Sequence, residues 1–282
     1  MPQASSAPCA RCLRSDPATA VSSSPLSDDL ALAVRAANAA DNITLPAFQA
    51  RTFRVDRKAD ASEVTEIDRA AETEVSGILR AERPGYSLYG EEHGVVGPND
   101  ATRQWVIDPI DGTSNFVRGV PVWATLIALV ENGVPIIGVV SAPALGRRWW
   151  AAQGAGAFQN GARLSVSSVA NLDDASASIT VTESWHRAGK TTQLDSLQRD
   201  VKRLRNYGDF WQHMLVAEGA VDFAIDAIGL GAYDNAAIYP VVTEAGGRVS
   251  DRHGAFDYRS NSLITSNGRL HDAVLGAVRD GR

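Results

Sequence analysis

Two aspartates in the segment WVIDPIDGTSNF (residues 105–116) have a spacing that suits metal binding. Asp108 ends an apolar run typical of a β-strand, Pro109 interrupts strand pairing, and Asp111 follows three residues after Asp108. A plain turn is the alternative, because Asp side chains often bond nearby backbone N–H groups. Carboxylate oxygens without His or Cys suit Mg²⁺. The metal site is favoured over the turn because further acids stand at strand ends and helix starts: Asp68, Glu91, Glu92 and Asp234.

The residues after Asp111 favour an anion site beside these carboxylates. Gly112 can adopt backbone conformations that other residues avoid, so a ligand could approach the chain closely there. Thr113, Ser114 and Asn115 favour a helix start, where backbone N–H groups and the helix dipole bind phosphate. Two carboxylates cannot attract a phosphate by themselves. The arrangement makes chemical sense only if divalent cations lie between the carboxylates and the anion.

Composition and charge narrow the class of protein. The chain has 282 residues, of which 44 % are hydrophobic and 21 % charged, and its formal net charge is −6. Such an acidic chain is not expected to bind nucleic acid by neutralising phosphates. No apolar run approaches the roughly 18–20 residues that span a bilayer, and we expect a cytoplasmic protein without a membrane partner. Residues 1–25, which contain Cys9 and Cys12, are rich in Ser, Ala and Pro and predict a disordered leader.

Hydrophobic periodicity predicts the elements that position these residues. A helical stripe begins after Ser27 or Asp28, and a second helix follows Thr65 and ends before Arg83. A turn at 131–133 joins two β-rich runs into a hairpin. The mixture of helices and hairpins predicts an α+β or layered α/β architecture. We predict strands at 53–56, 86–90, 104–108, 122–130, 136–140, 148–151, 156–158, 177–181 and 222–225, and further helices at 209–218 and 235–245.

Several motifs together resemble the inositol monophosphatase superfamily over residues 27–278. They are Gly90-Glu91-Glu92, the segment 105–116, and Tyr233-Asp234 before a helix that ends in Glu244-Ala-Gly-Gly247. Within the superfamily, residues 115–123 and 141–151 are similar to actinobacterial histidinol-phosphate phosphatases. The resemblance implies a layered α-β-α-β-α sandwich of the inositol monophosphatase/fructose bisphosphatase type. It also implies an N-terminal lobe over 26–165 that carries most metal ligands, a C-terminal lobe over 166–282, and a homodimer.

The resemblance also implies a role for each candidate site residue. The implied metal ligands, for two or three Mg²⁺ ions, are Glu91, Asp108, the carbonyl of Ile110, Asp111 and Asp234. The implied catalytic residues are Asp68, Thr113 and Glu91, of which Asp68 and Thr113 would hold and deprotonate the attacking water. The implied substrate-binding residues are Asp111, Gly112, Thr113, Ser114 and Asp209. Lys58 would balance the acidic site, and Asp209 has helix capping as its alternative role.

The activity implied is Mg²⁺-dependent hydrolysis of a small phosphorylated substrate, with histidinol phosphate expected. An inositol-phosphate or broad sugar-phosphate phosphatase and a catalytically silent metal-binding dimer scaffold are the alternatives. Two positions depart from the superfamily pattern: Tyr233 replaces a usual Trp, and Ala227 replaces an acid that often binds the substrate. Asp226 could substitute for that acid if its loop shifts, although adjacent residues on a strand face opposite sides.

Overall fold

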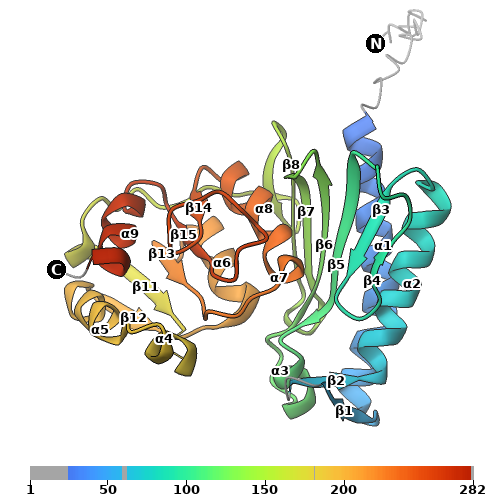
Figure 1. Cartoon of the computed structure of the whole chain (residues 1–282), viewed down its shortest axis with the longest axis horizontal. Coiled ribbons are helices and arrows are strands. Elements are labelled where there is room, and N and C mark those ends of the chain that lie inside the picture. Colours follow the sequence, from blue (N-terminus) through green and yellow to red (C-terminus); the bar gives the residue numbers. More distant parts are fainter. Residues whose placement is uncertain (1–24, 59–61, 181, 281–282) are drawn as a thin grey trace, which may run out of the picture.

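The computed structural model describes residues 25–58, 62–180 and 182–280, which form alternating layers of helices and sheets (Figure 1). The expected leader lies outside the described residues except for Pro25, where the first helix begins. That helix therefore starts ahead of the predicted caps Ser27 and Asp28. Two long helices form the outer layer against the larger sheet: α1 (Pro25–Ala50) and α2 (Glu66–Glu82).

An eight-stranded sheet forms the second layer and contains the predicted meander. Its strand order is β10-β9-β8-β7-β6-β5-β3-β4, and all neighbours are antiparallel except β3 and β5. The central strands β5, β6 and β7 are buried along most of their length, since helices cover both faces. The strands are β3 (Ser87–Gly90), β4 (Gly94–Val96), β5 (Arg103–Asp111), β6 (Ala124–Glu131), β7 (Val134–Ala142), β8 (Arg147–Ala152), β9 (Gly156–Gln159) and β10 (Ala162–Arg163).

Three helices lie between the two sheets and form the middle layer (Figure 1). They are α6 (Asp209–Ala217), α7 (Ala232–Ala236) and α8 (Ile238–Glu244). The prediction of a single helix over 235–245 is wrong, because the helix is interrupted between the end of α7 and the start of α8. Pro240 has no N–H to donate to the Ala236 carbonyl, so the regular hydrogen-bond ladder cannot run through this point.

A five-stranded sheet and an outer helical layer complete the predicted α-β-α-β-α sandwich, which is confirmed. The strand order is β12-β11-β13-β15-β14, in which β11 is parallel to both β12 and β13. The two-lobe division at residue 165 stays a prediction. The strands are β11 (Ser176–Ile179), β12 (Arg203–Arg205), β13 (Phe223–Ile225), β14 (Arg248–Ser250) and β15 (Ile264–Ser266), and the helices are α4 (Glu183–Arg187), α5 (Thr191–Asp200) and α9 (His271–Asp280).

Small elements connect the layers near the end of β5. A two-stranded sheet of β1 (Val55–Arg57) and β2 (Glu63–Thr65) lies beside the short helix α3 (Thr113–Arg118). Two short 3₁₀ segments span Pro143–Leu145 and Leu172–Asp174. This corner of the molecule joins the starts of α2 and α3 to the end of β5, and it therefore brings distant parts of the sequence together.

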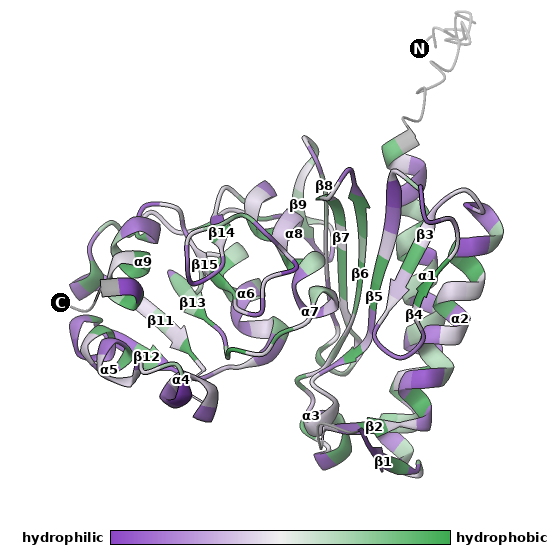
Figure 2. Ribbon diagram, viewed as in Figure 1, coloured by the Kyte–Doolittle hydropathy of each residue, from purple (hydrophilic) through white to green (hydrophobic). Residues whose placement is uncertain are grey.

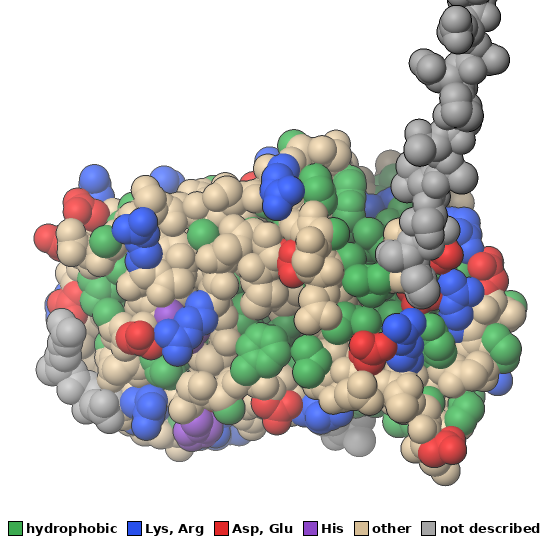
Figure 3. Space-filling model, turned by 90° about the horizontal axis from the view of Figure 1, so that it is seen from above, with side chains coloured by type: hydrophobic (Ala, Val, Ile, Leu, Met, Phe, Trp, Pro, Cys, Tyr) green, Lys and Arg blue, Asp and Glu red, His purple; other side chains and the backbone are tan. Residues whose placement is uncertain are grey.

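Hydrophobic residues concentrate in the middle of the molecule, as Figure 2 shows for β6 and β7. On the face shown in Figure 3, acidic and basic side chains are interspersed rather than separated into fields of one sign. None of the helices in the described part of the chain combines the length and the apolar character required of a membrane-spanning segment.

Candidate metal-dependent active site

The end of β5 places two aspartates on one side of the large sheet. Asp108 pairs with Leu126 on β6 and Asp111 pairs with Ala124, so β5 advances by three residues while β6 advances by two. Residues three apart on a regular strand face opposite sides, but one extra residue in a bulge restores the same side. Strand pairing therefore resumes at Asp111 rather than stopping at Pro109.

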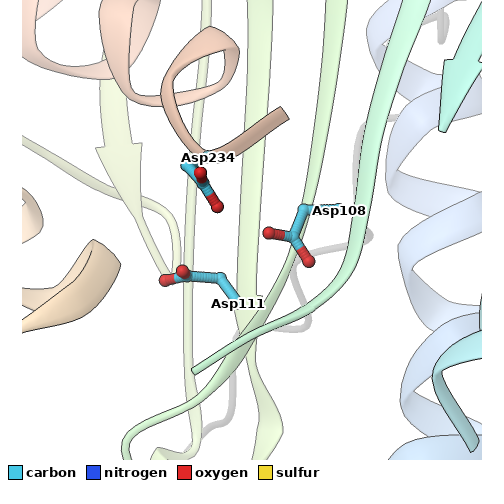
Figure 4. Close-up of side chains that lie close together, drawn as sticks. All are labelled: Asp108, Asp111 and Asp234. Carbon is cyan, nitrogen blue, oxygen red and sulfur yellow. The ribbon is translucent and has the colours of Figure 1, made fainter. Parts of the chain in front are cut away.

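Asp234 joins these two carboxylates from α7. It is the third residue of the helix, and its Oδ2 accepts a hydrogen bond of 2.5 Å from the Gly231 N–H. Carboxylate oxygens of Asp108, Asp111 and Asp234 all lie within 4.8 Å of one another, where the end of β5 meets α7 (Figure 4). The three donors are hard oxygen atoms, with no His or Cys in the group, and they fit a hard divalent cation.

The electrostatics of this carboxylate cluster require positive charge or protons. Burial, followed by repulsion from neighbouring acids, raises the pKa values of Asp108 and Asp111 well above the usual range. Burial also raises the pKa of Asp234 to about 6. The cluster in its fully ionised form is thus unfavourable by itself, and a bound divalent cation would relieve the repulsion.

Glu91 lies near the cluster, but its side chain is engaged elsewhere. Lys58 Nζ lies 2.7 Å from Glu91 Oε1 and 2.5 Å from Glu92 Oε1. Burial alone would lower the pKa of Lys58, but its hydrogen bonds to the two glutamates raise it. Burial raises the pKa of Glu91 to about 7 despite this ion pair, and the nearby Glu92 and Asp234 charges add to the shift. The structure therefore joins Glu91 to Lys58 rather than to the three aspartates.

We expect the stability of the cation-free protein to fall as pH rises. The folded-state pKa values of Glu91 and Asp234, about 7 and about 6, exceed their ordinary values of 4.5 and 3.8. Protonation of both groups thus stabilises the fold fully below about pH 4, and this contribution is lost as pH rises through about 6 to 7. Urea unfolding in EDTA should show a loss on the order of 3 kcal/mol between about pH 5 and 8.

Two comparisons test this pH dependence. In the Glu91→Gln variant the unfolding free energy should change less steeply with pH, because the substituted side chain no longer titrates. Added Mg²⁺ should raise the unfolding free energy most at the alkaline end, where the carboxylates are ionised and bind the cation best. A stability that rises with pH in EDTA and is unchanged in the Glu91→Gln variant would contradict the prediction.

Asp68 and Thr113 meet beside the cluster. Thr65 caps α2, and Asp68 Oδ2 accepts hydrogen bonds from Thr65 N at 2.8 Å and Thr65 Oγ1 at 2.5 Å. Asp68 Oδ1 accepts from Thr113 Oγ1 at 3.1 Å, and the same hydroxyl lies 3.0 Å from the Ile110 carbonyl oxygen. Asp68 is 1 % exposed, and burial raises its pKa. This pair can accept a proton from a third group at the Thr113 oxygen.

The turn between β5 and α3 has a backbone conformation that requires glycine at position 112. Gly112 has φ +83°, and a Cβ atom there would lie 2.9 Å from the Val122 carbonyl oxygen. The predicted helix start is found, since α3 begins at Thr113. Ser114 Oγ donates to Glu63 Oε2 at 2.7 Å, while Ile110 N donates to Asp108 Oδ1 at 3.0 Å. Side chains thus anchor the turn on both sides of Gly112.

Asp209 connects α6 to this turn and is not a helix cap. The cap residue is Gly208, and Asp209 is the first residue of α6, with φ +48°. Its Oδ2 accepts from Asn115 Nδ2 at 2.6 Å, and the next N–H, of Phe210, donates to Asp111 Oδ2 at 2.8 Å. Burial and the nearby Asp226 charge raise the pKa of Asp209 to about 6. The first turn of α6 is therefore fixed to the carboxylate cluster.

A cavity of about 230 Å³ extends from the cluster between α6, β13 and α7. Asp226 and Ala227 both line it. Because β13 ends at Ile225, strand alternation does not determine which way these two side chains face. The described residues that line it are Asp111, Thr180, Thr182, Asp209, Phe210, Asp226, Ala227, Leu230, Asp234, Asn235, Ile238 and Leu263.

His213 is a polar residue near this cavity that the sequence patterns did not indicate. It is fully buried on α6, and its Nε2 lies 3.0 Å from Asp226 Oδ2. The sequence offered no signal for this contact, because the histidines show no metal-ligand spacing and His213 and Asp226 stand on different elements. The position of His213 itself could have been noticed, because it lies four residues after the candidate Asp209 on the same predicted helix.

The layered fold and the buried carboxylate cluster define a class of layered α/β sandwich with a site that could hold a metal ion. The family described as the inositol monophosphatase family matches residues 26–281, and the chain belongs to it. Histidinol-phosphatases of Mycobacterium tuberculosis and Streptomyces coelicolor are 50 % and 48 % identical to the chain. The matches cover 90 % and 88 % of this chain, and 99 % and 96 % of those proteins.

A solved structure supports the same assignment. The extragenic suppressor protein SuhB from Bartonella henselae superposes with a TM-score of 0.84 and 28 % identity, covering 91 % of this chain and 100 % of that one. The predicted family and layered fold are therefore confirmed. The predicted enzyme class, a phosphoric monoester hydrolase, agrees with the names of the similar relatives.

Proposed function

We propose that the chain hydrolyses L-histidinol phosphate to L-histidinol and phosphate in a Mg²⁺-dependent reaction. The support comes from the relatives named histidinol-phosphatase and from the carboxylate cluster with its adjoining acidic cavity. The reaction is a direct attack of water on phosphorus, because phosphate-monoester hydrolysis depends mainly on positioning and charge neutralisation. The phosphorus–oxygen bond to the alcohol breaks, and solvent protonates the leaving alkoxide.

The metal ligands in this proposal are Asp108, Asp111 and Asp234, together with Glu91 and the Ile110 carbonyl. The first three already converge, while Glu91 would exchange its contact with Lys58 for the cation. Two or three Mg²⁺ ions, when bound, neutralise charge on the phosphate and lower the pKa of the attacking water. Lys58 retains Glu92 as a partner after such an exchange, so its charge stays paired.

The Asp68–Thr113 pair removes the proton from the attacking water. Thr113 Oγ1 donates its hydrogen to Asp68 Oδ1 and accepts the water proton in exchange. The raised pKa of buried Asp68 makes this carboxylate a stronger base than an exposed one. Backbone N–H groups at Gly112, Thr113 and Ser114 bind the phosphate oxygens at the start of α3.

The substrate assignment rests on the charge of the cavity. With Asp111 and Asp234 holding the cation, Asp209 and Asp226 are the remaining acids that line it. Lys, Arg and His are missing among its described lining residues. Such a cavity favours a phosphomonoester whose organic part is cationic, as the ammonium group of histidinol is, over a neutral inositol or sugar. This is the single observation that distinguishes histidinol phosphate from the other monoesters.

A cytoplasmic homodimer is part of the proposal. Trp149 on β8 is fully buried, whereas Trp150 is half-buried and its ring is stacked with Phe158 at 6.1 Å between centroids. A partly exposed aromatic pair on a sheet is typical of a subunit interface. Light scattering of the purified protein should give about twice the 30.0 kDa chain mass.

Phosphate release from a panel of monoesters tests the proposed substrate. We expect kcat/KM for L-histidinol phosphate to exceed those for inositol 1-phosphate and fructose 1,6-bisphosphate by about 100-fold, since two charged contacts distinguish them. Activity should vanish in EDTA and return with Mg²⁺. A preference for either of the other two substrates would refute the histidinol phosphate assignment and leave phosphatase activity in place.

A further inference from the structure

His213 is held by one polar contact on each ring nitrogen. Nε2 lies 3.0 Å from Asp226 Oδ2, and Nδ1 lies 2.8 Å from Thr265 Oγ1 on β15. The His213 side chain is 0 % exposed and sits between the middle helical layer and the five-stranded sheet. A buried imidazole with both nitrogens paired has a fixed ring orientation.

The chemistry of the partners determines which nitrogen carries the hydrogen. An ionised Asp226 carboxylate can only accept, so His213 Nε2 must donate to it. The Thr265 hydroxyl can then donate to Nδ1, so each ring nitrogen has a hydrogen-bond partner. In this arrangement the ring orients Asp226, which lines the cavity and faces a ligand there.

Asp226 needs such support because of the acids around it. Its other oxygen, Oδ1, accepts from the Ala227 N–H at 2.6 Å. The charges of Asp111, Asp209 and Asp234 all interact with it, and repulsion from them would turn the carboxylate away from the cavity. The hydrogen bond from His213 opposes that rotation and fixes the plane of the carboxylate.

The same helix fixes the carboxylate cluster and Asp226 relative to each other. Asp209 and Phe210 lie one turn before His213, so all three are near one another on α6. The first turn holds Asp111 through the Phe210 N–H, and the next holds Asp226 through the imidazole. One helix thus sets the spacing between the carboxylate cluster and the Asp226 carboxylate that lines the same cavity.

We propose that His213 is a positioning residue that holds the Asp226 carboxylate in place to bind the ammonium group of the substrate. The proposal rests on the proposed function, since it requires a substrate with a cationic organic part. His213 itself does not touch the substrate. It determines specificity because a carboxylate that is free to rotate loses part of its attraction for a cation at a fixed distance from the phosphate.

Two substitutions of His213 separate positioning from packing. His213→Leu fills a similar volume but removes both polar contacts, whereas His213→Gln places an amide donor where Nε2 lies. Kinetics of each are measured with L-histidinol phosphate and with p-nitrophenyl phosphate, whose organic part is neutral. We expect His213→Leu to raise KM for histidinol phosphate about 10- to 100-fold, the range for a hydrogen bond to a charged group. The kcat should change by less than about threefold. In His213→Gln, the KM for histidinol phosphate should return close to the wild-type value.

The results that overturn this inference differ from those that overturn the proposed function. If wild-type protein hydrolyses p-nitrophenyl phosphate but not histidinol phosphate, both the function and the inference fail. A different result leaves the function standing: the wild-type protein hydrolyses histidinol phosphate, but His213→Leu loses the same fraction of activity on both substrates or keeps full activity on both. In that case only the inference fails.

Thr265→Val provides a second variant if His213→Leu does not fold. It removes the hydroxyl that orients the ring and keeps the β-branched shape that suits β15. We expect the same selective rise in KM for histidinol phosphate at about threefold to tenfold, because the contact to Asp226 is loosened rather than removed. An equal effect of Thr265→Val on both substrates would overturn the inference.

Discussion

Asp108→Asn is expected to lower Mg²⁺-dependent kcat on the order of 1,000-fold and to make the cation-free protein more stable. Asp108 is the most buried acid of the carboxylate cluster, with 1 % exposure, and it faces both Asp111 and Asp234. The amide removes one ligand charge at the centre of the site, and loss of a preorganised charge typically lowers rates by about 100- to 1,000-fold. It also removes the burial of a charge and the repulsion that together raise the pKa of Asp108, so folding without a cation becomes easier.

Opposite changes in activity and stability distinguish a ligand from a merely structural aspartate. The amide oxygen can still accept the hydrogen bond from the Ile110 N–H, which keeps the turn in place. The measurements are phosphate release with saturating Mg²⁺ and urea unfolding in EDTA, where a gain of about 1–3 kcal/mol is expected. Asp272→Asn is the matched control, because Asp272 pairs with Arg248 on the surface with 81 % side-chain exposure. Retained activity, or lowered stability in EDTA, would contradict the assignment.

The carboxylate cluster was predictable from sequence because its signals are local. Asp108 follows the apolar run within β5, and Asp234 stands at a helix start. Thr65 and Asp68 form a capping box whose residue types and spacing are readable from the chain alone. Hydrophobic periodicity likewise located the hairpin and the long helices, since burial of one face imposes it.

Contacts between distant segments were not predictable in the same way. Lys58 was expected to balance the acidic site, but its pairing with Glu91 was not indicated by the sequence. The contact of His213 on α6 with Asp226 was not indicated either. These pairs depend on how the two sheets are oriented around the middle helical layer, which no local pattern encodes. The strand alternation assumed for Asp226 and Ala227 does not apply for a related reason. Both residues follow β13, and where that strand ends depends on its pairing with β11 and β15.

Asp68→Asn is expected to lower kcat by about 100- to 10,000-fold while leaving Mg²⁺ affinity nearly unchanged. The oxygen of the substituted amide can still accept from the Thr65 N–H, and its nitrogen can donate to Thr113 Oγ1, so the fold is preserved. What is lost is the acceptor for the proton that Thr113 passes on. Calorimetric Mg²⁺ titration and phosphate-release kinetics on the same samples measure the two effects separately.

Variants of Thr113 complete this test, because the two residues act as one unit in the proposed proton transfer. Thr113→Ser keeps the hydroxyl and should retain activity within about tenfold, whereas Thr113→Val should match the loss in Asp68→Asn. The kcat of the double variant Asp68→Asn/Thr113→Val should then be little lower than that of either single variant, since each single substitution already abolishes the same proton transfer. Additive losses in the double variant would mean that the two side chains act independently, and a fall in Mg²⁺ affinity equal to the fall in kcat would make Asp68 a metal ligand instead of a base.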